Sequence, residues 1–156
     1  MDSPNSEDLR GLLKRFHEQI SEIDRFATAV LKAHFLVEEQ IDSLLEVVAK
    51  NPKHLEGRPS FDRKVKWIRA FGPLGDNEHW QLILALNTLR NKVAHKFDGP
   101  EREAAIANLR NEFRQVMEPD PKDKELRDYN LLLVASMFSV AFLVRLRSLV
   151  TNKELI

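Results

Sequence analysis

The chain has 156 residues, about the size of one domain, and is long enough to bury a single core without disulfides or structural metals. Its composition of 43% apolar and 31% charged residues excludes both a disordered chain and a membrane protein. The 24 basic and 24 acidic side chains cancel, so no global field attracts nucleic acid, and RNA would need a local cleft. The absence of cysteine excludes disulfides, thiolate metal sites and cysteine nucleophiles, and it favours a cytoplasmic location. The first eight residues lack the pattern of a secretory signal.

Apolar residues recur every three or four positions in the N-terminal third of the chain. They predict a first amphipathic helix that begins near Ser6. Its apolar stripe consists of Leu9, Leu12, Leu13, Phe16 and Ile20. This helix either continues or bends near Ser21. The same periodicity runs from Ile23 to Val48, and Asn51-Pro52 stops it, so a long helix is expected to end near Lys50.

Two candidate capping residues mark the starts of the next helices. Residues 51–60 hold two prolines and a glycine and predict a loop. At its end, Ser60 is positioned to cap a short helix over residues 61–71. After a turn rich in glycine and proline, Asn77 is positioned to cap a helix whose buried stripe covers residues 80–93.

Prolines delimit the C-terminal helices. Pro100 suits the first position of a fifth helix, because its fixed backbone angle is already helical there. Residues 117–122, with two prolines, close that helix, and a last helix is expected from near Asp123 to about Val150. The apolar run of the last helix, residues 131–144, is shorter than the ~20 residues of a membrane span, so we interpret it as a core helix.

These elements predict an all-α fold, a single-domain helical bundle of about five to six helices over residues 1–156. Residues 1–5 are expected to form a flexible tail. Long helices in a small bundle often leave an apolar face for a second copy, which favours a homodimer. The aromatic side chains of Trp67, Phe71 and Trp80 could stack on bases, but their helical spacing favours the core.

One segment carries a recognisable chemical motif, Arg90-Asn91-Lys92-Val93-Ala94-His95, in the last turns of the helix that follows Asn77. It resembles the signature of the HEPN superfamily, in which four to six residues separate an arginine from a histidine and a polar residue commonly follows the arginine. The resemblance extends more loosely to residues 32–39 and to the order of helices after Val30. It implies a HEPN-like bundle.

In catalytically active HEPN proteins the implied activity is metal-independent RNA cleavage, which needs no cofactor. The resemblance implies Arg90, Asn91 and His95 as catalytic residues. By their charge, Lys92 and Lys96 give a local basic patch that is expected to bind the substrate. Histidine has an ordinary pKa of ~6.5 and can take the proton of a ribose 2′-hydroxyl near neutral pH. Arginine offers a planar fork of donors to the phosphate, and the product would be a 2′,3′-cyclic phosphate.

Helix geometry separates the two ends of this motif. At ~100° per residue, Arg90 and His95 lie about 140° apart around a straight helix. Two arrangements could still bring them to one site. Either the helix ends or distorts before His95, or a second copy brings its own Arg90 and His95 to a dimer cleft. Asn91 and His95 are four residues apart and share a face, so Asn91 could orient the imidazole or bond the phosphate.

A structural interpretation of the same motif remains open. His95 could cap the helix C-terminus while Arg90 bonds Glu38 or Glu39 across the bundle. Two functions follow from the two interpretations. The first is a HEPN-type RNase, such as a toxin with an antitoxin partner or a defence component. The second is a non-catalytic regulatory or protein-interaction module, similar to the mannitol operon repressor family. A helix-turn-helix DNA binder ranks behind both, because no basic recognition helix stands out.

The remaining histidines have no obvious partner in the sequence. They are His17, His34, His54 and His79. For each, a surface position or a satisfied place in the core is the favoured interpretation. No histidine pair has metal spacing, and no glycine loop or glycine-flanked serine suggests another site.

Overall fold

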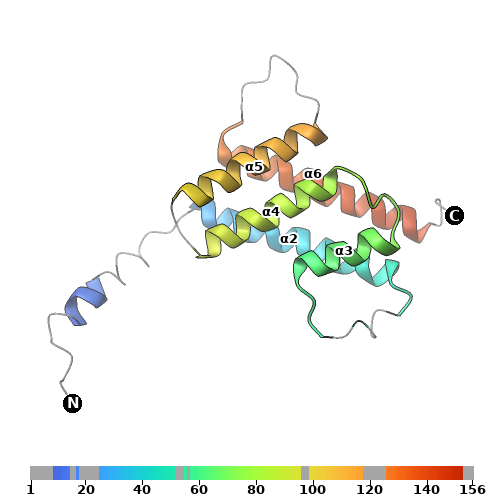
Figure 1. Ribbon diagram of the computed structural model, residues 1–156, viewed down its shortest axis with the longest axis horizontal. Coiled ribbons are helices and arrows are strands. Elements are labelled where there is room, and N and C mark those ends of the chain that lie inside the picture. The colour runs from blue at the N-terminus through green and yellow to red at the C-terminus, as the bar shows by residue number, and fades with distance from the viewer. Residues whose placement is uncertain are drawn as a thin grey trace.

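The computed structural model describes residues 9–14, 17, 25–51, 55, 57–95, 99–117 and 126–152, and of His95 it describes the backbone alone. All regular secondary structure in these residues is helical, which confirms the predicted all-α bundle. The helices are α2 (Arg25–Val48), α3 (Phe61–Phe71), α4 (His79–His95), α5 (Pro100–Val116) and α6 (Asp128–Thr151), preceded by a helical segment at residues 9–14 (Figure 1).

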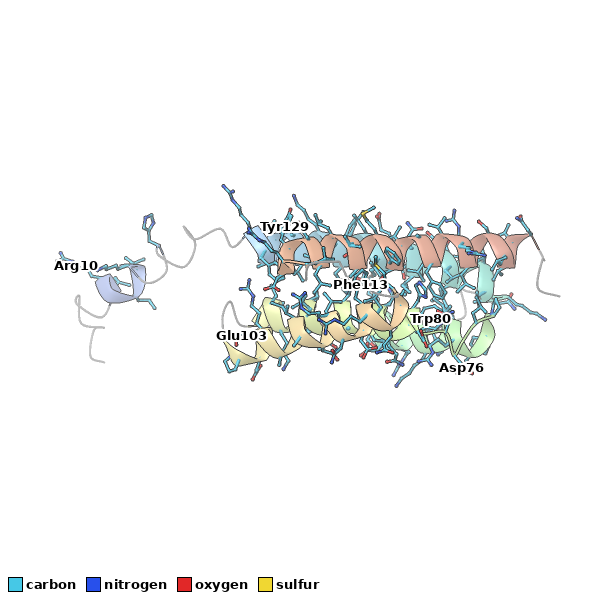
Figure 2. The ribbon with its side chains drawn as sticks, turned by 90° about the horizontal axis from the view of Figure 1, so that it is seen from above. Arg10, Asp76, Trp80, Glu103, Phe113 and Tyr129 are labelled. Atoms are coloured by element: carbon cyan, nitrogen blue, oxygen red, sulfur yellow. The ribbon has the colours of Figure 1, made fainter. Side chains whose placement is uncertain are left out.

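The five labelled helices form two layers. The long helices α2 and α6 lie side by side and run in the same direction, while α4 runs the opposite way (Figure 1). Helices α3, α4 and α5 make the second layer, and the rings of Trp80 and Phe113 lie between the layers (Figure 2). Contacts of α4 with α2, α5, α6 and α3 make it the central helix of the bundle.

The predicted caps are confirmed at three helix starts. The Ser60 hydroxyl accepts from the Arg63 backbone N–H at 3.4 Å and begins α3. The Asn77 side-chain oxygen accepts from the His79 backbone N–H at 3.0 Å and begins α4. Pro100 is the first residue of α5, as predicted. These starts follow from local chemistry, since each cap satisfies an N–H group or tolerates its absence in the first turn.

The predicted start of the last helix near Asp123 is wrong. Leu126 and Arg127 are not helical, and α6 begins at Asp128. The reason is a contact with α5: the Arg110 guanidinium donates to the Leu126 carbonyl at 2.7 Å and to the Asp128 carboxylate at 2.8 Å. These two bonds hold the chain extended before the helix, and the Asp128 charge suits the positive end of the helix dipole.

Helix α6 is a core helix, as predicted. By length and composition it could cross a membrane, the one helix that passes this test in the described part of the chain. One face nevertheless lies in the core. The buried residues of α6 are Leu131, Leu132, Ala135, Ser136, Ser139, Phe142, Leu143 and Leu146. The hydroxyls of Ser136 and Ser139 donate to carbonyls one turn earlier, so the two buried polar groups are satisfied within the helix.

The aromatic residues expected in the core divide into three cases. Trp80 is fully buried, and Trp67 is partly buried against the core. The prediction is wrong for Phe71, whose side chain is 65% exposed. Phe71 is the last residue of α3, where the chain turns away at Gly72 and leaves the ring beyond the packed part of the helix.

The N-terminal apolar stripe does not join the core in its described part. Leu9, Leu12 and Leu13 are all exposed, and their helical segment lies apart from the bundle, where Figure 2 labels Arg10. Ser6, Phe16, Ile20 and the tail at residues 1–5 lie outside the described residues. The expected helix is thus present at residues 9–14, but its apolar face is not buried by the chain's own bundle.

Candidate functional site on helix α4

Helix α4 carries the motif and is mostly a core element. Its buried apolar residues are Trp80, Leu82, Ile83, Ala85, Leu86, Leu89 and Val93. Among the buried residues of α4 that the structure describes, Asn87 is the one with a polar side chain. It lies three residues before Arg90 and four before Asn91, so it precedes the motif by one helical turn. The motif therefore begins one turn after a buried polar side chain.

Asn87 joins three helices. Its Oδ1 atom lies 2.9 Å from His34 Nε2 on α2, and its Nδ2 donates to the Asp62 carboxylate of α3 at 3.0 Å. A carboxylate oxygen only accepts, so the Asn87 amide nitrogen must face Asp62 and its oxygen must face His34. His34 Nε2 therefore carries a hydrogen and donates. The prediction that His34 is a satisfied core histidine is confirmed.

Burial determines the charge of His34. Desolvation lowers the pKa of His34 below 6.5, the hydrogen bond to Asn87 and the Glu38 charge act to raise it, and the Arg90 and Lys64 charges lower it further. The imidazole is therefore neutral at pH 7. Its Nδ1 atom lies 3.8 Å from the Glu38 carboxylate, too far for a hydrogen bond. The His34 ring also packs against Phe61, with centroids 4.7 Å apart.

Glu38 does not meet Arg90 in this structure. Its carboxylate accepts from Lys64 Nζ at 2.9 Å, and the same ammonium lies 2.7 Å from Asp42. Desolvation acts to lower the pKa of Lys64, but its bonds to Asp42 and Glu38 raise it overall. The expected Arg90 contact with Glu38 or Glu39 is therefore wrong for the described side chains, because Lys64 of α3 is the cation that reaches Glu38.

Arg90 reaches around α4 to its neighbour instead. Arg90 Nη1 donates to Asn91 Oδ1 at 3.0 Å, and both side chains are half-buried. In the described part of the chain Arg90 forms no ion pair, so its charge is not neutralised by a carboxylate. The bond brings the guanidinium to the Asn91 side of the helix. Position 95 is only about 40° from position 91 around the axis, so this side is also that of His95.

The helix continues through the end of the motif. Since α4 includes His95, the alternative in which it ends before His95 is wrong. The side chain of His95 and all of Lys96 lie outside the described residues. Lys92 pairs with Glu101 at the start of α5 at 3.2 Å, and both side chains are partly exposed. Of the predicted site, the structure therefore brings together Arg90 and Asn91, while Lys92 bonds another helix.

Two residues that bind Asn87 were not predicted from the sequence. His34 and Asp62 meet Asn87 from other helices, and such long-range contacts leave no local pattern. Asn87 itself carried a signal, because it interrupts an otherwise apolar stripe one turn before Arg90. A polar residue on the buried face of a core helix needs partners and so indicates a network.

The described residues contain no group of three histidine, aspartate or glutamate side chains that could hold a metal ion. Comparison of the chain with models of known families, with characterised proteins and with solved structures finds no match.

Proposed function

We propose that the protein is a HEPN-type, metal-independent ribonuclease that acts in the cytoplasm. The observation that carries this proposal is the hydrogen bond from Arg90 to Asn91, which draws the guanidinium toward the helix face that also holds position 95. Positions 90 and 95 lie about 140° apart around the helix, and this bond turns the Arg90 guanidinium toward the face of position 95. The resemblance of residues 90–95 to the HEPN signature supplies the class of reaction.

Three residues of the motif have definite roles in this reaction. His95 takes the proton of the ribose 2′-hydroxyl, whose oxygen attacks the adjacent phosphorus. Arg90 donates hydrogen bonds to the non-bridging phosphate oxygens and stabilises the charge that develops on them. The 5′-oxygen leaves and takes up a proton from water, and a 2′,3′-cyclic phosphate remains. The proton of the 2′-hydroxyl passes from His95 back to the solvent. Asn91 holds the guanidinium through its amide oxygen.

The charges around Arg90 favour this assignment. Glu38, one of the two acidic residues expected to bind Arg90, is already paired with Lys64. An arginine without an ion pair keeps its donors for a phosphate. A homodimer, in which each copy contributes Arg90 and His95 to one cleft, suits a chain without a global basic field. Such an enzyme fits a toxin held by an antitoxin or a defence component.

The test is cleavage of mixed RNA by the purified protein in the presence of a chelator. We expect wild-type activity that is lost by at least about a hundredfold in His95→Ala and in Arg90→Ala. Arg147→Ala removes an exposed arginine of α6 and is the matched control, with activity unchanged. The thermal midpoint of each variant is measured first. Folded wild-type protein without chelator-resistant cleavage would overturn the proposal.

A second candidate, a protein-interaction module, rests on an exposed apolar surface of the α2/α6 layer. Glu38 of α2 points toward α3, and Leu36 lies about 160° around the helix from it, on the α6 side. Phe138 of α6 packs edge-on against Phe113 of α5, and Leu133 lies about 140° from it, on the α2 side.

These positions define an α2/α6 strip. Its members are Leu36, Val47, Leu133 and Val144, each between 41% and 55% exposed. Contiguous exposed apolar residues of two packed helices commonly mark an interface. In this function another protein chain covers the strip, and the Arg90–Asn91 hydrogen bond has a structural role only.

Two matched leucines distinguish this candidate. Leu36→Glu changes the strip, whereas Leu31→Glu changes a leucine of comparable exposure, 45% against 55%, on the opposite flank of α2. We expect Leu36→Glu to dissociate an assembly measured by sedimentation equilibrium and Leu31→Glu to leave it intact. A wild-type monomer, or equal effects of both variants, would reject the strip as a homodimer interface.

A further inference from the structure

A groove lies between the N-terminal end of α4 and the C-terminal half of α6, outside the motif. Its volume is about 550 Å³, within the range of small-molecule sites. The walls are mainly apolar side chains, among them Leu74 of the preceding turn and Phe138, Phe142 and Leu149 of α6. The groove begins about 16 Å along the α4 axis from Arg90, so it is separate from the proposed nuclease site.

The aromatic wall of the groove is firmly held. The ring of His79 stacks on Phe142 with centroids 4.6 Å apart and planes 15° from parallel. Trp80 meets the same Phe142 ring edge-on at 5.3 Å, and Trp80 lies in the core between the layers (Figure 2). An apolar ligand would therefore meet a surface whose side chains are already positioned, which reduces the entropy cost of binding.

The turn that forms the other wall is strained. Leu74 has a φ of 59°, a conformation uncommon for a residue with a side chain. Two hydrogen bonds maintain it, because the Leu74 carbonyl accepts from Trp80 Nε1 at 2.8 Å and from the Asn77 backbone N–H at 3.1 Å. Its apolar side chain lines the groove although it is about half exposed. Backbone strain of this kind gathers at ligand sites.

Polar groups gather at the α4 end of the groove. Asn77 Oδ1 lies 2.8 Å from His79 Nδ1 and also accepts from the His79 backbone N–H. The amide oxygen is an acceptor, so Nδ1 carries the hydrogen and His79 Nε2 is left as an acceptor in the neutral ring. Burial lowers the pKa of His79, while the Glu78 charge acts to raise it. The Asn77 Nδ2 hydrogens have no partner among the described residues.

Among the residues that the structure describes, one cation lines this groove. Arg145 of α6 lines it, is exposed, and forms no ion pair with any residue that the structure describes. No acidic side chain lines the groove among those residues. The site thus combines an apolar body with one positive charge and neutral hydrogen-bonding groups.

We propose that this groove binds a small amphipathic carboxylate, whose carboxyl group pairs with Arg145 and whose apolar body lies against Leu74, Phe138 and Phe142. A guanidinium binds a carboxylate through two parallel hydrogen bonds, and the apolar wall removes ligand surface from water. Asn77 Nδ2 and His79 Nε2 add a donor and an acceptor for a hydroxyl on the ligand.

The experiment titrates the full chain with 4-phenylbutyrate and with its neutral amide, 4-phenylbutyramide, by isothermal calorimetry and by intrinsic tryptophan fluorescence, to which Trp67 and Trp80 both contribute. The carboxylate should bind saturably and about tenfold more tightly than the amide, since a charged hydrogen bond contributes on the order of 1.4 kcal/mol or more. Arg145→Gln should remove this preference. Arg147→Gln, an exposed arginine two residues away that does not line the groove, should preserve it.

A variant of the wall supplies a second measurement. Ala141 lines the groove and is exposed, so Ala141→Phe should fill the site without disturbing the core and should abolish binding. Equal affinity for acid and amide, equal loss in Arg145→Gln and Arg147→Gln, or undiminished binding by Ala141→Phe would each overturn the proposal. So would sedimentation showing that Ala141→Phe dissociates a dimer, since a second copy would then occupy the groove. Nuclease activity should be unaffected in every variant, so failure of this proposal would leave the proposed function standing.

Discussion

The side chain of Asn87 on α4 lies 2.9 Å from His34 on α2 and binds it through a buried hydrogen bond. The same amide donates to Asp62 of α3, so one side chain links the three consecutive helices α2, α3 and α4. Arg90 and Asn91 follow within one turn of α4. The position of the candidate site therefore depends on this contact as well as on apolar packing.

Asn87→Ala should destabilise the fold by about 1–3 kcal/mol, because it leaves the buried His34 N–H without an acceptor. The free energy of unfolding in urea measures the effect. Thr88→Ala is the adjacent control, since Thr88 is exposed and bonds only the Leu84 carbonyl of its own helix, and it should change stability by less than about 0.5 kcal/mol. Equal effects of the two substitutions would contradict the structural role of Asn87.

Ser60→Ala should cost about 0.5–1 kcal/mol, at the lower end for an N-cap, because the bond from the Arg63 N–H is long at 3.4 Å. Ser60→Asp keeps an acceptor at the cap and adds a negative charge at the helix start, so it should restore wild-type stability or exceed it. Thermal unfolding of the three proteins checks both expectations. An alanine variant as stable as wild type would show that α3 begins through its packing alone.

Local chemistry made much of this fold predictable. Ser60, Asn77 and Pro100 begin helices where a cap or a proline predicted them, since such signals act within one turn of the chain. The start of α6 was not predictable in the same way. It depends on Arg110, a residue of another helix that binds the chain ahead of Asp128.

The candidate site was predictable only in part. The order of residue types from Arg90 to His95 identified the segment. Helix geometry predicted that positions 90 and 95 lie about 140° apart around the axis, and α4 does continue through His95. What the sequence could not state is the rotamer of Arg90, which bonds Asn91 rather than crossing to Glu38. Glu38 instead binds Lys64 of α3, a contact that exists only after the helices pack.

The substitutions Ile41→Ala and Leu36→Ala compare the cost in stability of truncating a buried and an exposed side chain of α2. Ile41 is 0% exposed, so its truncation should cost about 2–5 kcal/mol through lost burial and a cavity. Leu36 is 55% exposed, and its truncation should cost less than about 0.5 kcal/mol for a single chain in solution. Urea unfolding at several protein concentrations measures both. A large, concentration-dependent cost of Leu36→Ala would indicate that another chain covers the α2/α6 strip.

Stability should fall on acidification below about pH 6.5 because of His34 and His79. Burial holds the pKa of both groups below the 6.5 expected for the unfolded chain, although Asn87 and Glu38 partly oppose this for His34, and Glu78 for His79. Above pH 6.5 neither state binds the protons. Between the folded pKa and 6.5, the unfolded chain binds protons that the folded protein does not, so the free energy of unfolding decreases as the pH falls.

The slope in that window is at most about 1.4 kcal/mol per pH unit for the buried His34, and it is smaller for His79, which is only partly buried and is therefore screened by solvent. The double variant His34→Gln/His79→Gln removes both groups and should show a flatter dependence of stability on pH between 5 and 6.5, whatever its absolute stability. Urea unfolding in a series of buffers measures the slope, and comparison of slopes separates proton binding from any loss of packing. If the variant kept the wild-type slope, the acid sensitivity would have to come from carboxylates, and the neutral, hydrogen-bonded His34 at the α2–α4 contact would be rejected.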